Sequence, residues 1–111
     1  MANPDSVGLT DYKPAVVLAS GTEDSVSLER HKRYHLYHDG EDASGNACTQ
    51  TIYLRCNADT VDADTSEGAN KAKLKSGGNL TIGPGVDTLY FKMASEDCTF
   101  TIIPTEYRGA I

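Results

Sequence analysis

Three histidines, His31, His35 and His38, lie close together and are the side chains best suited to bind a transition metal. In an extended strand His35 and His38 point to opposite faces, because their positions differ by an odd number. A helix would align His31 with His35, but the tyrosine-rich stretch around them has strand character. We therefore predict that these histidines form no metal site.

The acidic stretch from Asn57 to Asn70 offers carboxylates, which are the ligands that Ca²⁺ prefers. An EF-hand loop that opens at Asp62 would need a glycine one place before Gly68, and Lys73 stands where its bidentate glutamate belongs. A structureless segment of this length is uncommon in a compact domain. We predict a long solvated loop without a bound cation.

The three cysteines, Cys48, Cys56 and Cys98, are potential nucleophiles, but a catalytic thiolate needs a basic neighbour that lowers its pKa. Cys56 and Cys98 fall on the inward phase of their strands, so we predict that they pack in the core as small hydrophobic side chains. Cys48 lies in a turn-rich segment and is predicted to be accessible. The odd number of cysteines favours free thiols in a reducing compartment.

Two other motifs also fail to indicate chemistry. Gly83-Pro84-Gly85 lacks the lysine and the following helix of a phosphate-binding loop, and no serine lies in a nucleophile elbow. The basic run from Arg30 to Arg33 is followed by tyrosines, as in some nucleic-acid interfaces, but it is short and lies in an acidic chain. We predict that the protein is not an enzyme and that it has no catalytic, cofactor-binding or metal-binding residues.

Alternation of apolar and polar residues dominates the elements that position these side chains. The stretch from Leu74 to Pro104 holds three apolar runs separated by Gly-Gly, Gly-Pro-Gly and a polar loop, which predicts a sheet with one buried face. Similar runs occur earlier, and turn signals recur about every ten residues. We predict an all-β fold, an antiparallel β-sandwich or jelly roll of about seven or eight short strands. Strands are expected near residues 15–19, 25–29, 34–38, 51–56, 71–75, 80–82, 88–93 and 98–102.

The length of 111 residues suits one domain. We predict an N-terminal arm at residues 1–13, a sandwich at 14–104 and a C-terminal arm at 105–111, because both ends lack periodicity. Acidic residues outnumber basic ones by 16 to 10, for a net charge of −6, which disfavours nucleic acid and anionic membranes as partners. We also predict no signal peptide and no transmembrane segment.

The pattern of strands resembles the small β-sandwich virion proteins of tailed bacteriophages, in particular capsid decoration (cement) proteins. The resemblance rests on the loose N-terminal arm, on four strand segments and on the glycine-rich turn before the run at residues 88–93. These segments are Val26-Ser27-Leu28, Tyr34-His35-Leu36-Tyr37, Thr51-Ile52-Tyr53-Leu54, and Gly78 to Val86 followed by Leu89-Tyr90-Phe91.

The resemblance implies a non-enzymatic structural protein located in the virion and assembled in the host cytoplasm. Its expected partners are the major capsid protein or another virion protein, together with further copies of itself, a trimer being the leading expectation. Terminal arms can order on a neighbouring protein and anchor there. The residues expected to bind the partner are Tyr12, Tyr107, Arg108 and Ile111.

Three alternatives stay open. The chain could be another head–tail or tail module of a phage. It could also be a carbohydrate- or ligand-binding β-sandwich that uses the loops at residues 39–46 and 57–70, although these loops carry no aromatic platform. A metal-dependent cupin-like enzyme ranks last, because the chain lacks the His-x-His pair with the following glutamate and histidine.

Overall fold

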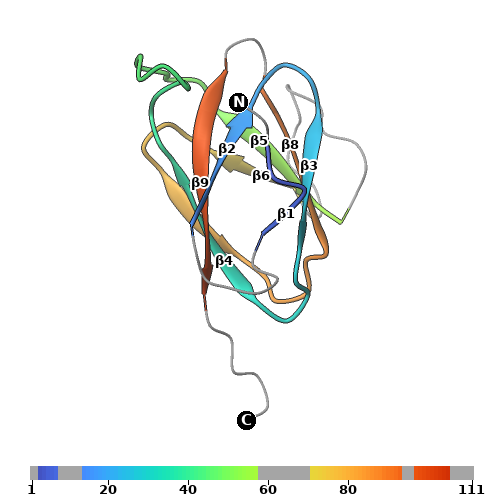
Figure 1. Ribbon diagram of the computed structural model, residues 1–111. Coiled ribbons are helices and arrows are strands. Elements are labelled where there is room, and N and C mark those ends of the chain that lie inside the picture. The colour runs from blue at the N-terminus through green and yellow to red at the C-terminus, as the bar shows by residue number, and fades with distance from the viewer. Residues whose placement is uncertain (1–2, 8–13, 58–70, 94–96, 106–111) are drawn as a thin grey trace.

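The computed structural model describes residues 3–7, 14–57, 71–93 and 97–105 of the chain (Figure 1). These residues contain nine strands and no helix, and the strands form two packed sheets, which confirms the predicted all-β sandwich. The strands are β1 (Ser6–Val7), β2 (Ala15–Ala19), β3 (Asp24–Leu28), β4 (Arg33–His38), β5 (Ile52–Cys56), β6 (Lys71–Leu74), β7 (Asn79–Ile82), β8 (Thr88–Met93) and β9 (Cys98–Thr105).

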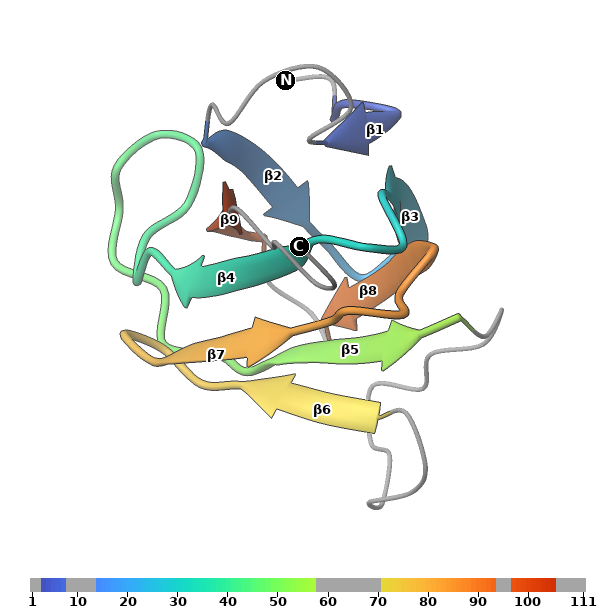
Figure 2. The ribbon, with the colours of Figure 1, turned by 90° about the horizontal axis from the view of Figure 1, so that it is seen from below.

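The two sheets differ in size, with five strands in one and four in the other. One sheet has the strand order β1-β3-β8-β5-β6, and the other has the order β2-β9-β4-β7. Neighbouring strands are antiparallel except β1 and β3, which pair in parallel. Consecutive strands such as β2 and β3, or β4 and β5, lie in different sheets, so the chain crosses repeatedly between the layers (Figure 2). Residues distant in sequence are therefore brought side by side.

The core lies between the sheets and follows the predicted alternation. Phe91 of β8 and Phe100 of β9 come from opposite sheets and meet edge to face, with ring centroids 5.1 Å apart. Each fully buried side chain of this size contributes about 1.5–3 kcal/mol to folding. Leu80 of β7 is only half-buried. The other buried residues of the core include Val17, Val26, Leu28, Tyr34, Leu36, Ile52, Leu54, Leu74, Ile82, Leu89, Met93 and Ile102.

Residues 3–7 fall within the segment predicted as an arm, but they pack against the sandwich. The Asn3 side-chain amide donates to the carbonyl of Leu18 and accepts from the Leu18 N–H, both at 2.8 Å. An amide placed in this way satisfies an edge-strand backbone as a neighbouring strand would. The N-terminal segment therefore protects the edge of β2.

Strand β1 also covers a buried hydroxyl. Ser6 and Val7 pair in parallel with β3, and the Val7 side chain is buried. The Tyr34 hydroxyl donates to the Val7 carbonyl at 3.0 Å and accepts from the Glu29 N–H at 2.7 Å. Burial raises the pKa of this phenol above its ordinary value. Two residues are too few to show a period, which is why the sequence did not reveal this strand.

The cysteine predictions require correction. Cys48 and Cys98 form a disulfide with a Cα–Cα distance of 5.9 Å, within the usual range for such bonds. Cys48 is 2% exposed, so it is not the accessible thiol that was predicted. Cys98 does lie in the core, but as half of a covalent pair. Cys56 is the free cysteine among the described residues; it is half-buried, and burial raises the pKa of its thiol.

The turn after β7 requires glycine for a steric reason. Gly83 has a φ of +85°, and a Cβ there would lie 2.5 Å from the carbonyl oxygen of Lys32. Strand β9 extends through Thr105, the first residue of the predicted C-terminal arm, which pairs with Arg33 of β4. Across the described residues, no helix has the length and apolar character needed to cross a membrane.

Candidate functional site

A buried cluster of His38, Cys48 and Cys98 is the one group of potential metal ligands in the described part of the chain. The ligand atoms of the three residues lie within 4.8 Å of one another. His38 ends β4, Cys98 begins β9, and Cys48 lies in the loop at residues 39–51 that connects β4 to β5, the β4–β5 loop. The histidine stretch and the cysteines, which are separate features in the sequence, thus meet at one end of the sandwich.

The hydrogen bonds of His38 indicate that this cluster has a structural role. The Gly40 N–H donates to Nδ1 at 3.0 Å, and Nε2 lies 2.7 Å from the Gln50 carbonyl oxygen. A carbonyl can only accept, so Nε2 carries the proton and the imidazole is neutral. Both ring nitrogens are therefore occupied, and metal binding would require breaking one of these bonds. In this arrangement, His38 joins the two ends of the β4–β5 loop and supports the disulfide.

The other two histidines lie away from this cluster. His35 points to the opposite face from His38, as the odd spacing predicted, and its Nδ1 lies 2.7 Å from the Thr81 hydroxyl. His31 is exposed in the turn before β4. The three histidines therefore do not converge on one site.

The start of the β4–β5 loop reaches the outer surface of the β2-β9-β4-β7 sheet. The carboxylate of Asp39 accepts hydrogen bonds from the hydroxyls of Thr99 at 2.8 Å and Thr101 at 2.9 Å. Thr99 also donates its backbone N–H to the Glu41 carbonyl at 2.9 Å. Thr99 lies on the outward phase of β9 and is nevertheless 5% exposed, because the loop covers it.

Asp42 stabilises the next part of the β4–β5 loop. Its carboxylate accepts from the N–H groups of Asn46 at 2.9 Å and Ser44 at 2.8 Å. These hydrogen bonds, that from Asn46 first, lower the pKa of this exposed carboxyl below its ordinary value. The turn residues recognised in the sequence therefore produce a folded loop with its own internal hydrogen bonds.

The outer face of the β2-β9-β4-β7 sheet, called here the threonine face, carries almost no charge. One row crosses all four strands through the paired residues Val16, Thr101, Tyr37 and Asn79. Val16 is 48% exposed and Tyr37 is 40% exposed, and these are the exposed large hydrophobic side chains of the described residues. Two charged groups lie on this face, Arg33 of β4 and the Asp39 carboxylate of the β4–β5 loop. The strand residues of the face are Val16, Leu18, Arg33, His35, Tyr37, Asn79, Thr81, Thr99, Thr101, Ile103 and Thr105.

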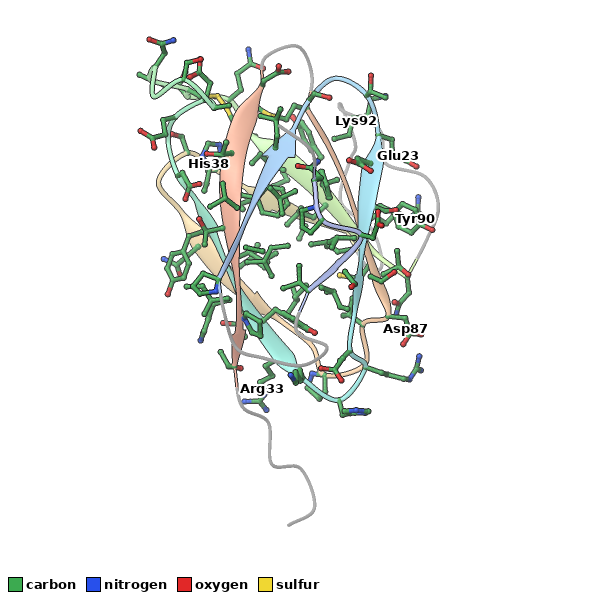
Figure 3. The ribbon with its side chains drawn as sticks, in the orientation of Figure 1. Glu23, Arg33, His38, Asp87, Tyr90 and Lys92 are labelled. Carbon is green, nitrogen blue, oxygen red and sulfur yellow. A yellow bond between two sulfur atoms is a disulfide. The ribbon has the colours of Figure 1, made fainter. Side chains whose placement is uncertain are left out.

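The outer face of β8, β5 and β6, called here the cationic face, is different. Tyr53 lies between Lys73 and Lys92 in register, and Arg55 lies opposite Tyr90. Figure 3 shows Tyr90 and Lys92 projecting from the same side of the molecule, with the acidic Glu23 beside them. In a chain of net charge −6, this sheet face gathers positive charge among tyrosines.

The residues predicted to bind a partner, Tyr12, Tyr107, Arg108 and Ile111, lie outside the described residues. Most of the acidic stretch, residues 58–70, lies outside them as well. The threonine face was not predicted from the sequence, although the pattern of β9 indicates it. The outward phase of β9 reads Thr99, Thr101, Ile103 and Thr105 and has no charged residue.

Comparison with protein-family models, with curated proteins and with solved structures finds no match to this chain.

Proposed function

We propose that this protein is a structural component of a phage virion, a capsid decoration protein that binds the head through the threonine face. The observation that carries the proposal is the uncharged row Val16, Thr101, Tyr37 and Asn79, with Val16 and Tyr37 exposed on one sheet face. Protein interfaces are depleted of charge at their centre and enriched in aromatic residues. The resemblance of the strand pattern to phage decoration proteins supplies the partner, the major capsid protein.

The charge distribution supports this choice of face. An acidic chain is repelled by an acidic partner surface, and this repulsion is weaker where the approaching face carries few acidic groups. The hydroxyls of Thr101 and Thr105 already donate within the chain, but each can still accept a hydrogen bond across an interface without the desolvation cost of a buried ion. The threonine face is thus suited to persistent contact with a protein surface.

Cosedimentation with phage heads that lack this protein tests the proposal. Tyr37→Ala and Val16→Lys are expected to weaken binding by at least about tenfold, because exposed aromatic and aliphatic anchors supply much of an interface's affinity. Tyr53→Ala is the matched control, since it removes the same side chain from the centre of the cationic face. Equal loss with Tyr37→Ala and Tyr53→Ala, or no loss with either, would contradict docking through the threonine face.

Salt provides a second test of the same contact. Binding through an uncharged face is expected to change little between about 0.05 M and about 0.5 M NaCl, because few charges are screened. A steep loss of binding with salt would instead indicate the cationic face. The gene neighbourhood is a further test, since genes for a capsid or portal protein are expected beside the gene for this chain.

A carbohydrate-binding function is the second candidate, and Tyr37 favours it. Its exposed ring lies beside Asn79 in register and near Thr81, which offer an amide and a hydroxyl to sugar hydroxyl groups. A glycan-binding screen that shows binding lost in Tyr37→Ala, together with no binding to heads, would favour this candidate over decoration.

A further inference from the structure

The β4–β5 loop is fastened to the sandwich mainly at its two ends. The His38 ring bonds Gly40 at the start of the loop and Gln50 near its end. The Cys48 N–H donates to the Gly40 carbonyl at 2.9 Å, and the Ser76 hydroxyl donates to the Cys48 carbonyl at 2.9 Å. Between these points the loop forms a single isolated bridge, from Glu41 to Ala47. Cys48 is therefore the place where the returning loop is attached.

The disulfide links this attachment to the threonine face. Cys98, the partner of Cys48, is followed directly by Thr99, which donates its N–H to Glu41 and its hydroxyl to Asp39. The Asp39 carboxylate also receives the hydroxyl of Thr101, which belongs to the exposed row of the face. The covalent bond, the loop and two threonines of the face thus form one connected structure.

We propose that the Cys48–Cys98 bond is a redox switch for the threonine face. The oxidised chain holds the β4–β5 loop closed, with Asp39 bound to Thr99 and Thr101, and presents an ordered docking surface. The reduced chain allows the loop to open and the face to loosen. This inference rests on the proposed function in that it takes the threonine face as the docking surface.

The chemistry is thiol–disulfide exchange with a small-molecule disulfide such as oxidised glutathione. The thiolate of Cys48 or Cys98 attacks the small disulfide, forms a mixed disulfide and releases one small thiol. The second protein thiolate then attacks the mixed disulfide, forms the Cys48–Cys98 bond and releases a second small thiol. The two protein thiols lose two electrons and two protons, and the small disulfide gains them.

Burial of both sulfurs gives the switch its direction. Cys48 is 2% exposed and Cys98 is fully buried, so a small thiol reaches the bond only when the loop opens. The bond forms when the loop packs on β9 and is then shielded from reductant. A chain assembled in a reducing cytoplasm is expected to become locked after release into an oxidising medium.

Amide hydrogen exchange on the full-length chain tests the switch without any partner. Reduction with a phosphine is expected to speed exchange at Gly40, Cys48 and Thr99 by at least about tenfold, while the amides of β5 and β8 change much less. Cys56→Ser is the control and is expected to leave this difference intact, because Cys56 takes no part in the bond. Equal exchange at these three amides in the oxidised and reduced chains would overturn the proposal.

Cosedimentation with heads tests the consequence. The reduced chain and the Cys48→Ser/Cys98→Ser variant are expected to bind at least about tenfold more weakly than the oxidised chain. The Asp39→Asn variant retains the disulfide but has weaker hydrogen bonds from residue 39 to Thr99 and Thr101. This variant is therefore expected to bind heads weakly in both redox states. Equal binding by oxidised and reduced chains would overturn the switch. If the oxidised chain binds no heads, the proposed function fails, and the hydrogen-exchange result alone decides whether the bond controls the face.

Discussion

The two outer sheet faces of this protein are built by the same alternation and yet differ in charge and in support. The threonine face has hydroxyls and apolar side chains, and the β4–β5 loop folds onto its margin through Asp39. The cationic face has Arg55, Lys73 and Lys92 among tyrosines, with Lys73 on the edge strand β6. The threonine face is organised by a covalently attached loop, whereas the described part of the cationic face consists of strand residues.

This difference indicates which face is suited to permanent contact. A surface that must fit a partner benefits from side chains held in place before binding, because less entropy is lost on association. The hydroxyl of Thr101 is held in this way, whereas long lysine side chains must be ordered at the moment of contact. This difference favours the threonine face as the proposed docking surface.

Among the changes that test the difference between the two faces, removal of the disulfide is expected to cause the largest loss of stability. The sequence separation of 50 residues between Cys48 and Cys98 gives a loop-closure contribution of about 4 kcal/mol. Urea unfolding of the Cys48→Ser/Cys98→Ser variant is expected to show a loss of this size, while Cys56→Ser is expected to show a much smaller one. A loss below about 1 kcal/mol would show that the loop is held by its hydrogen bonds rather than by the disulfide.

Tyr34 provides the next test, because its hydroxyl connects β4 of one sheet to β1 of the other. Tyr34→Phe leaves the Val7 carbonyl and the Glu29 N–H without this partner and is expected to cost about 1–3 kcal/mol in urea unfolding. An unchanged unfolding midpoint would mean that water replaces the hydroxyl at no cost.

The same substitution gives a pH dependence with a defined sign. The folded-state pKa of Tyr34 is raised above 10.0, so its contribution to stability is fully present below pH 10.0 and is lost as pH rises through the folded pKa. Stability of the unmodified chain is therefore expected to fall more steeply above pH 10.0 than that of Tyr34→Phe. Parallel pH curves for the two proteins would contradict this assignment.

A threonine pair compares the two faces directly. Thr101→Val removes a hydroxyl that donates to Asp39 at 2.9 Å and is expected to cost about 1 kcal/mol. Thr88→Val makes the same change on the outward phase of β8, beside the cationic face, and is expected to change stability by less than about 0.5 kcal/mol. Equal costs in urea unfolding would show that the loop does not support the threonine face.

The smallest effect is expected from charge reversal on the cationic face. Lys92→Glu is expected to change the free energy of unfolding by less than about 0.5 kcal/mol and to leave binding to heads unchanged, because the side chain is on the solvated face. A marked loss of binding, with folding intact, would move the docking surface to this face.

The predicted arms can now be tested separately. Residues 106–111 include Tyr107, Arg108 and Ile111, which are predicted to bind the partner. Deleting these residues is expected to weaken assembly while the domain still folds. Deleting residues 1–13 would not test an N-terminal anchor alone. The deletion also removes β1, the buried Val7 and the Asn3 amide that hydrogen-bonds the backbone of Leu18. Single substitutions of Tyr12 are the better test of an N-terminal anchor, measured by the same cosedimentation.

Local pattern was sufficient for eight of the nine strands, because each has enough alternating residues to define a buried face. The exception, β1, is too short for any period to appear. Local pattern also assigned Cys98 to the buried phase of its strand and placed His35 and His38 on opposite faces. It did not reveal what they contact, because phase specifies a side of the sheet and leaves the partner open.

The sequence by itself therefore determined an acidic all-β chain, the faces of its strands and the turns between them, since these depend on neighbours within a few residues. Only the tertiary structure decided that Cys48 meets Cys98, that His38 holds the ends of the β4–β5 loop, and that Asp39 reaches two threonines of β9. The physical reason is that β4 and β9 are neighbours in one sheet although most of the chain separates them. Strand pairing of this kind depends on how the two sheets pack, which no local pattern records.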